Sequence, residues 1–321
     1  MLVTVTLMST GHRGLQSLRA PGSACAMELL FVFVTLLIGS RLVSAHSDWT
    51  YWGETGPAHW PDKCVTGTQQ SPINIVTEDA VKMDMGSLKF VRYEVAYTGT
   101  ITNNGHSVEI RLNGLPIMLQ GADLPATYGL EQMHFHWGAE HTMDSVRDAL
   151  ELHFVHYDKQ YENAATAVHF KNGIAVVATL FELSKQDNPD LAPILEATAS
   201  VSKWVGKNEA ELRSKIIPYL FLPKDYTSYY RYDGSLTTPG CQESVMWFVM
   251  AEKLTISEEQ LRIFKNVWTH NSTLLFNYRP TQSLGDRKVY HHLEGYSAAA
   301  IVSSNLLYTV VGLLLVRILS Q

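Results

Sequence analysis

Two histidine-containing stretches constrain this chain more than any other feature of its sequence. The first reads Gln-Met-His-Phe-His-Trp at residues 132–137, and the second reads Glu-Leu-His-Phe-Val-His at residues 151–156. If both stretches are strands, side chains two residues apart share one face. His134 and His136 then project together from one strand, and His153 joins them from a neighbouring strand.

Three imidazoles placed in this way are typical of a catalytic zinc site, which leaves a fourth coordination position open. Gln132 precedes His134 by two residues, and Glu151 precedes His153 by the same spacing. Each is suited to accept a hydrogen bond from the ring N–H that its histidine does not use for the metal. The alternative is a set of ordinary strand histidines, which the combined spacing disfavours. The pattern predicts a Zn²⁺ cofactor held by His134, His136 and His153.

The rest of the chain favours one mainly β domain. Residues 108–112 alternate between apolar and polar side chains, and residues 174–180 form a longer apolar run, so both are predicted strands. One helix is expected over residues 190–205. A second begins at Ser257, where Gln260 completes a capping box. The net charge of −6 and the lack of a basic cluster argue against a nucleic-acid partner.

Both ends of the chain are predicted to be targeting segments. Residues 1–45 are expected to be an upstream segment and a signal peptide, because an apolar run is followed by small residues that suit cleavage. Residues 46–292 are expected to form the globular domain. Residues 293–321 are typical of a C-terminal hydrophobic anchor signal or membrane segment. We favour a glycosylphosphatidylinositol (GPI) anchor signal over a retained membrane span and over a peripheral helix.

A secretory route makes the cysteines interpretable. Cys25 lies in the predicted signal, so Cys64 and Cys241 are the pair left in the mature chain. An oxidising compartment favours a disulfide between them, and two separate buried thiols are the alternative. Asn271 begins an Asn-Ser-Thr sequon, which is a glycosylation acceptor when it lies on the surface. The predicted location is the extracellular face of the plasma membrane.

Several further motifs accompany the two histidine stretches. They are Gly-Pro-Ala-His-Trp at 56–60, Gln-Ser-Pro-Ile-Asn-Ile at 70–75, Asn-Asn-Gly-His at 103–106, Glu-His-Thr at 140–142 and Ser-Leu-Thr-Thr-Pro at 235–239. With these motifs the chain resembles one family, the animal-type (α-class) carbonic anhydrases, from about residue 49 to residue 287. The resemblance implies a central twisted, mostly antiparallel sheet with short peripheral helices in a single α+β domain. It also points to a disulfide between Cys64 and Cys241, as in extracellular, membrane-attached family members.

The activity implied by the resemblance is the zinc-dependent, reversible hydration of carbon dioxide to bicarbonate and a proton. Residues 46–292 would then be the catalytic domain. Thr237 matches the hydroxyl that accepts a hydrogen bond from zinc-bound hydroxide and donates its own proton to a carboxylate, here Glu140. Gln132 and Glu151 match the residues that support the ligand histidines.

The resemblance also assigns the proton path and the substrate wall. His106 matches a proton shuttle, and an imidazole with an ordinary pKa of about 6.5 suits that task. Tyr51 and Asn104 match residues of the water network beside it. Residues expected at the substrate are mostly apolar, which suits uncharged carbon dioxide; they are Val155, Val176, Leu236, Val245, Trp247 and the bicarbonate neighbour Thr238.

One segment departs from the family pattern. Only three residues separate His136 from Glu140, where the family usually has a longer loop, and residues 147–150 are also unusual. From Glu140 to His153 the spacing matches again. We therefore expect the strand that carries Glu140 to keep its register with His153 and to bring the carboxylate to Thr237.

The sequence has two alternative interpretations. The shortened loop motivates the alternative of a carbonic-anhydrase-like ectodomain that binds zinc or a partner and has impaired catalysis. A zinc peptidase is disfavoured because the chain has no His-Glu-x-x-His helix.

Overall fold

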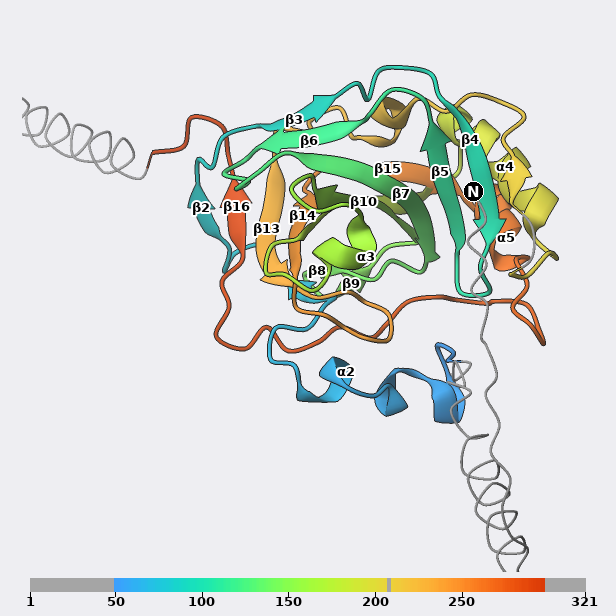
Figure 1. Cartoon of the computed structure of the whole chain (residues 1–321), viewed down its shortest axis with the longest axis horizontal. Helices are drawn as coiled ribbons and strands as arrows, with labels where there is room; N and C mark the ends of the chain where they lie inside the picture. Colours follow the sequence, from blue (N-terminus) through green and yellow to red (C-terminus); the bar gives the residue numbers. More distant parts are fainter. Residues whose placement is uncertain (1–48, 207–208, 298–321) are drawn as a thin grey trace, which may run out of the picture. The chain divides into compact units, whose positions relative to one another are not determined.

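The computed structural model describes residues 49–206 and 209–297 (Figure 1). Among these residues the main sheet has 13 strands. They are β2 (Val81–Met83), β3 (Leu88–Val91), β4 (Thr98–Asn103), β5 (Val108–Asn113), β6 (Met118–Gly121), β7 (Tyr128–Trp137), β10 (Leu150–Asp158), β11 (Ile174–Ser184), β12 (Ala210–Glu211), β13 (Tyr229–Gly234), β14 (Val245–Met250), β15 (Leu254–Ser257) and β16 (Tyr290–His292).

The path of this sheet runs β12-β4-β5-β7-β10-β11-β14-β13-β16-β2, with β15 beside β11 and with β6 joining β3 to β7. Three of its pairs are parallel, β11 with β14, β11 with β15 and β16 with β2, and the others are antiparallel. A small second sheet joins β1 (Asn74–Ile75), β8 (Thr142–Met143) and β9 (Val146–Arg147). The prediction of a mainly β, mostly antiparallel fold in a single domain is confirmed.

Short helices surround the sheet, as the sequence predicts (Figure 1). The α-helices of the described residues are α2 (Lys63–Thr66), α3 (Ala164–Ala167), α4 (Ala192–Val201) and α5 (Glu258–Lys265). Single 3₁₀ turns are η1 (Gly53–Thr55), η2 (Pro57–His59), η3 (Pro189–Leu191) and η4 (Pro218–Phe221).

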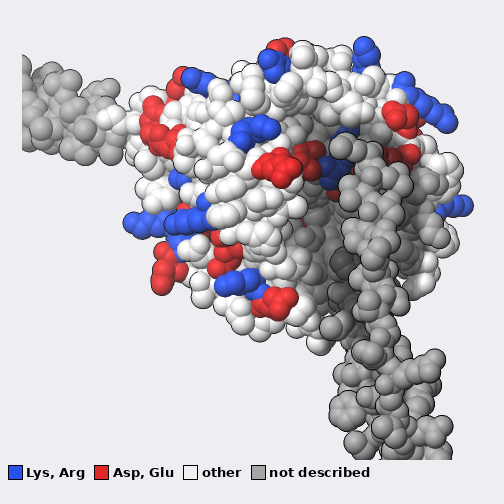
Figure 2. Space-filling model, in the orientation of Figure 1, with Lys and Arg blue, Asp and Glu red and all other residues white. Residues whose placement is uncertain are grey.

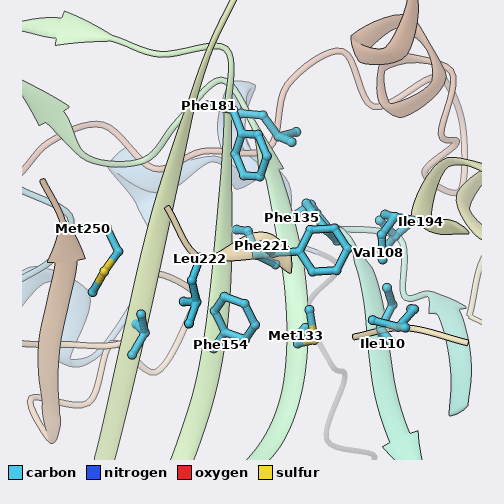
Figure 3. Packing of buried hydrophobic residues seen from close by; sticks show 14 of the residues in the cluster. Val108, Ile110, Met133, Phe135, Phe154, Phe181, Ile194, Phe221, Leu222 and Met250 are labelled. Atoms are coloured by element: carbon cyan, nitrogen blue, oxygen red, sulfur yellow. The ribbon is translucent and has the colours of Figure 1, made fainter. Parts of the chain in front are cut away.

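Strands β7 and β10 are the two histidine stretches, and they pair antiparallel with His153 directly opposite His134. Their apolar side chains, including Met133, Phe135 and Phe154, are fully buried in the large core on the face opposite the histidines (Figure 3). Each buried phenylalanine stabilises the fold by roughly 1.5–3 kcal/mol. Because a one-residue slip would expose this whole row, the core holds the histidines in register.

Helix α5 supports the end of β7. The predicted capping box is present: Ser257 Oγ accepts a hydrogen bond from the Gln260 amide (3.1 Å), and Gln260 Oε1 accepts from the Ser257 amide (3.2 Å). The buried ring of Phe264 packs against Phe135 and Trp137, with centroids 5.2 and 5.8 Å apart. The helix thus braces the strand that carries His134 and His136.

The predicted helix over residues 190–205 is shorter in the structure. It starts as η3 and ends at Val201. The carbonyl of Ser202 accepts hydrogen bonds from Asn103 Nδ2 (3.1 Å) and from the Trp268 amide (2.7 Å). Because tertiary partners take this carbonyl, the helix ends before the glycine at position 206.

A disulfide joins Cys64 to Cys241, across a separation of 177 residues. The sequon residue Asn271 is exposed, in a turn between Trp268 and Thr273, and its glycosylation stays a prediction. The predicted signal segment, residues 1–45, and residues 298–321 of the predicted anchor lie outside the described residues. In the part that the structure describes, no helix is both long and apolar enough to cross a membrane.

Charged side chains are mixed on the face shown in Figure 2. On the part of this face that the grey residues leave visible, lysine and arginine lie among aspartate and glutamate. A mixed surface of this kind does not focus a field on one class of charged ligand.

Candidate functional site

A cavity of about 280 Å³ lies beside β7 and β10. Nearly all of the residues that the sequence singles out meet at its wall. The lining residues are Trp49, Tyr51, Asn104, His106, Ser107, Glu109, Gln132, His134, His136, His153, Val155, Val176, Leu236, Thr237, Thr238 and Trp247. The remaining predicted residues, Glu140, Glu151 and Val245, do not line the cavity and are buried.

The three histidines form one cluster. The ring centroids of His134 and His136 lie 4.9 Å apart, those of His134 and His153 lie 5.0 Å apart, and those of His136 and His153 lie 4.6 Å apart. One nitrogen from each ring lies within 4.8 Å of the others. The arrangement follows directly from the strand alternation and the β7–β10 register.

Each histidine is held at its outer ring nitrogen by an oxygen. His134 Nδ1 lies 2.8 Å from Gln132 Oε1, and His153 Nε2 lies 2.6 Å from Glu151 Oε1. His136 Nδ1 lies 2.6 Å from the carbonyl oxygen of Asn277. A neutral imidazole has one N–H, so donating it outward leaves a lone pair on the nitrogen that faces the cluster.

The residues present fit a bound metal ion. His136 Nε2 is buried and has no hydrogen-bond partner among the described residues. Burial, followed by the neighbouring His136 and His153, holds the pKa of His134 well below its ordinary value, and burial also lowers the pKa of His136. Neutral imidazoles are the form that binds metal, and three of them suit a zinc-type site.

Glu151 ties the cluster to a second buried histidine. Its Oε2 accepts the backbone N–H of His141 (2.8 Å), while its Oε1 also lies 2.7 Å from His141 Nδ1. Burial alone would raise the pKa of Glu151, but the contacts with His141 and His153 hold it well below its usual range. His141 Nε2 in turn lies 2.7 Å from the hydroxyl of Tyr232. Neither His141 nor Tyr232 has a predicted role in the sequence, because the contacts of His141 with Glu151 and with Tyr232 arise from the fold.

Glu140 is the residue whose placement differs most from the expectation. It lies in the connection between β7 and β8, so the prediction that a strand carries it is wrong. Gly138 turns the chain with a φ of +44°, and the Ala139 amide donates to the carbonyl of Asp148 (3.0 Å). With only three residues available, the chain turns there before it can extend a strand.

The two oxygens of Glu140 have different surroundings. Oε1 accepts the backbone N–H of Arg279 (2.9 Å). Oε2 lies 3.6 Å from His136 Nε2 and has no hydrogen-bond partner among the described residues. Thr237 lines the cavity and is 6% exposed. The hydrogen bond from Thr237 to Glu140 stays a prediction.

His106 lies at the cavity wall, in the turn between β4 and β5. Its ring stacks on Trp49 with centroids 3.6 Å apart and an interplanar angle of 8°. The Asn104 side chain accepts the His106 amide N–H (2.9 Å), and the His106 carbonyl accepts from Asn277 Nδ2 (3.0 Å). The sequence predicts no role for Trp49, because its contact with His106 joins residues that lie far apart in the chain.

The apolar part of the wall comes from three strands and one loop. Val155 and Val176 lie opposite each other on β10 and β11. Trp247 on β14 donates its ring N–H to the carbonyl of Ser235 (3.1 Å), so its polar edge is satisfied and its ring can face the cavity. Leu236 follows Ser235 and completes this wall. Val245, 2% exposed, is buried beyond it.

Comparison with known proteins agrees with this geometry. A family model described as eukaryotic-type carbonic anhydrase matches residues 55–293. Carbonic anhydrase 6 of Mus musculus is 37% identical over 264 residues, covering 77% of this chain and 82% of the relative. Carbonic anhydrase 4 of Oryctolagus cuniculus is 33% identical over 281 residues, covering 82% and 90%. Carbonic anhydrase 7 of Homo sapiens is 34% identical over 263 residues, covering 77% and 98%. The chain therefore belongs to the eukaryotic-type carbonic anhydrases, enzymes that hydrate carbon dioxide.

Proposed function

We propose that this carbonic anhydrase uses zinc held by His134, His136 and His153 to interconvert carbon dioxide and bicarbonate. The observation that carries the proposal is the orientation of the three rings. Each outer nitrogen is held by an oxygen, and the inner nitrogens converge within 4.8 Å of one another. Zinc bound there would supply a Lewis acid that makes water nucleophilic at neutral pH.

The chain's own residues divide the remaining work. The apolar wall of Val155, Val176, Leu236 and Trp247 would hold uncharged carbon dioxide without competing hydrogen bonds. The Thr237 hydroxyl would orient the attacking oxygen by accepting its proton in a hydrogen bond. Thr237 can do so only if its own proton has an acceptor, and Glu140 Oε2 is free to take that role.

The reaction releases one proton for each bicarbonate that forms. The imidazole of His106 would take this proton at the cavity wall and pass it to buffer in bulk water. Tyr51 and Asn104 line the same part of the cavity and would order the water between. Thr238, also at the wall, would contact bicarbonate before it leaves.

The test is a stopped-flow measurement of carbon dioxide hydration together with the zinc content of the purified protein. We expect one zinc per chain and rapid hydration. His153→Ala should lose both zinc and activity, because two imidazoles cannot complete the site. Undiminished zinc in His153→Ala would place the metal elsewhere and reject the assignment.

One observation favours a second candidate, a zinc-binding ectodomain with impaired catalysis. Glu140 Oε2 lies beside His136 and makes no hydrogen bond to Thr237 among the described residues. Kinetics of Thr237→Ala, Glu140→Gln and the double variant separate the candidates. If Thr237 and Glu140 act together in catalysis, the double variant should lose less hydration activity than the sum of the losses in the two single variants. Zinc at one equivalent with negligible wild-type hydration would favour the second candidate.

We also propose that the protein follows the secretory route to the extracellular face of the plasma membrane, where a C-terminal GPI anchor holds it. The disulfide between Cys64 and Cys241 supports an oxidising compartment. Phosphatidylinositol-specific phospholipase C should release the protein from intact cells. Retention of this protein, while a known GPI-anchored control is released, would favour a membrane span.

A further inference from the structure

The connection between β7 and β8 is held by a residue outside it, Arg147 on β9. Its Nη1 donates to the carbonyl oxygen of Ala139 and lies 3.2 Å from that of Glu140. One guanidinium therefore holds two successive carbonyls, one of which belongs to Glu140 itself. Arginine suits this position because its planar group presents several N–H donors in a rigid fork.

The same guanidinium lies on an aromatic ring. Arg147 Cζ is 4.1 Å from the ring centroid of Tyr278, a cation–π distance. The Tyr278 ring also covers Gly138, where an added Cβ would lie 2.6 Å from the ring atom Cε1. Arg147 and Tyr278 thus enclose the connection at Gly138, Ala139 and Glu140.

Tyr278 sits between two residues that contact the proposed active site. The carbonyl of Asn277 accepts the hydrogen bond from His136 Nδ1 (2.6 Å), and the amide of Arg279 donates to Glu140 Oε1 (2.9 Å). Arg147 therefore joins the segment that carries Glu140 to the segment that orients both Glu140 and His136. Two other hydrogen bonds restrain the same connection, from the Ala139 amide to the Asp148 carbonyl (3.0 Å) and from the His141 amide to Glu151 Oε2 (2.8 Å). They use amides on either side of Glu140, whereas Arg147 holds the carbonyls of Ala139 and Glu140.

We propose that Arg147 is a positioning residue for Glu140, acting through the carbonyls of Ala139 and Glu140 and through Tyr278. Its effect on catalysis rests on the function proposed above, whereas its effect on the position of Glu140 does not. The competing explanation is that Arg147 only stabilises the β8–β9 hairpin, in which case its loss would lower stability without moving the carboxylate.

The test compares zinc-loaded Arg147→Met with Arg213→Met. The side chain of the matched control arginine is 76% exposed, and among the described residues its ion pair is a distant one, 3.8 Å from Glu196. We expect Arg147→Met to keep one zinc and to lower kcat/KM roughly 10- to 100-fold, the size that a displacement of about 1 Å can cause. Arg147→Lys should recover part of the loss, because it restores the charge and one donor. Arg213→Met should match the wild type.

A second measurement does not depend on activity. The Arg279 amide is buried and donates to Glu140 Oε1, so its hydrogen exchange, followed by ¹H–¹⁵N NMR, reports whether the carboxylate stays in place. Lower global stability speeds the exchange of every buried amide. The acceleration at the Arg279 amide in Arg147→Met should therefore exceed that at the Phe154 amide of the same protein at least tenfold, and Arg213→Met should show no such difference. If Arg147→Met fails to fold, Arg147→Lys and Tyr278→Leu give the same comparison, with Tyr278→Phe as the variant that keeps the ring.

The outcomes separate the two proposals. Unchanged exchange of the Arg279 amide would overturn the positioning role, whatever the kinetics. Faster exchange of the Arg279 amide in Arg147→Met, with kcat/KM unchanged from that of an active wild type, would overturn the proposed effect of Arg147 on catalysis. In the Glu140→Gln background, Arg147→Met should lower kcat/KM little further. Fully additive losses of kcat/KM from the two substitutions would also overturn the proposal. A wild-type protein without hydration activity would instead reject the proposed function, leaving the exchange comparison to decide the role of Arg147.

Discussion

Replacing Glu151 with glutamine tests how the protein prepares His153 to bind zinc. The carboxylate is fully buried and accepts three hydrogen bonds, from His153 Nε2, His141 Nδ1 and the His141 amide. Glutamine has nearly the same shape but only one acceptor oxygen, and its other end is a donor. The substitution therefore changes hydrogen bonding while leaving the packing almost unaltered.

Either orientation of the glutamine is costly. If its oxygen faces the two rings, its NH₂ group meets the His141 amide, and a buried donor without an acceptor costs about 1–3 kcal/mol. The two remaining bonds also lose their ionic character, at about 1 kcal/mol each. If the amide is reversed, His153 must carry its proton on Nδ1, the nitrogen that faces His134. In that tautomer Nδ1 has no lone pair to offer to a metal in the cluster.

We therefore expect Glu151→Gln to destabilise the metal-free protein by about 3 kcal/mol and to weaken zinc binding roughly 10- to 100-fold. Urea unfolding and competition with a chelator of known affinity measure the two effects. Glu182→Gln, at an exposed position on β11, is the matched control. A loss of unfolding free energy below about 1 kcal/mol, together with a zinc affinity within twofold of the wild-type value, would refute the reasoning.

The pH dependence gives a second check on the same variant. The pKa of Glu151 lies well below its ordinary value of 4.5 in the folded protein. A carboxyl group whose pKa is lower in the folded protein than in the unfolded chain stabilises the fold at pH values above its unfolded-state pKa. This stabilisation is lost as the pH falls through its folded-state pKa. The stability gap between metal-free wild type and Glu151→Gln should thus stay constant from pH 7 down to about pH 5. Below pH 4.5 it should narrow.

Three other substitutions give independent predictions. Burial lowers the pKa of His156 to about 4, so at pH 5 its imidazole is protonated in the unfolded chain and neutral in the folded protein. Between pH 7 and pH 5, metal-free wild type should therefore lose about 2 kcal/mol more unfolding free energy than His156→Gln. Equal losses of the two proteins in urea unfolding would contradict this. His106→Ala should lower kcat while kcat/KM barely changes, with recovery in imidazole buffer, and an equal fall in both constants would point to damage at the zinc site or substrate wall. Cys64→Ser should lower the free energy of unfolding by up to ~5 kcal/mol on the chain-entropy model, since the bridge spans 177 residues; unchanged urea unfolding would show that the disulfide contributes nothing.

Local patterns in the sequence were enough for much of the candidate site. The side-chain period of a strand is two, so residues 132–137 alone place His134 and His136 on one face, with Gln132 beside them. The capping box at Ser257 is equally local, because a helix start is decided within one turn. These features depend on neighbours in the chain, and they can therefore be read without the fold.

Only the tertiary structure decided the contacts made by backbone groups and by distant segments. The carbonyl of Asn277 orients His136, and the amide of Arg279 holds Glu140. Backbone groups of this kind occur in nearly every residue, so the sequence does not indicate which of them makes these contacts. The end of α4 also depends on Asn103 and Trp268, which lie far away in the sequence.

The connection at Glu140 shows the limit most clearly. The sequence revealed that it is short, and its spacing to His153 suggested an extended strand. In the structure Gly138 turns the chain instead, and Arg147 and Tyr278 enclose the turn. The connection between β7 and β8 consists of residues 138–141, and packing against residues from β9 and from residues 277–279 selects its conformation. That selection is a property of the folded chain, because the selecting side chains are adjacent to the connection only in space.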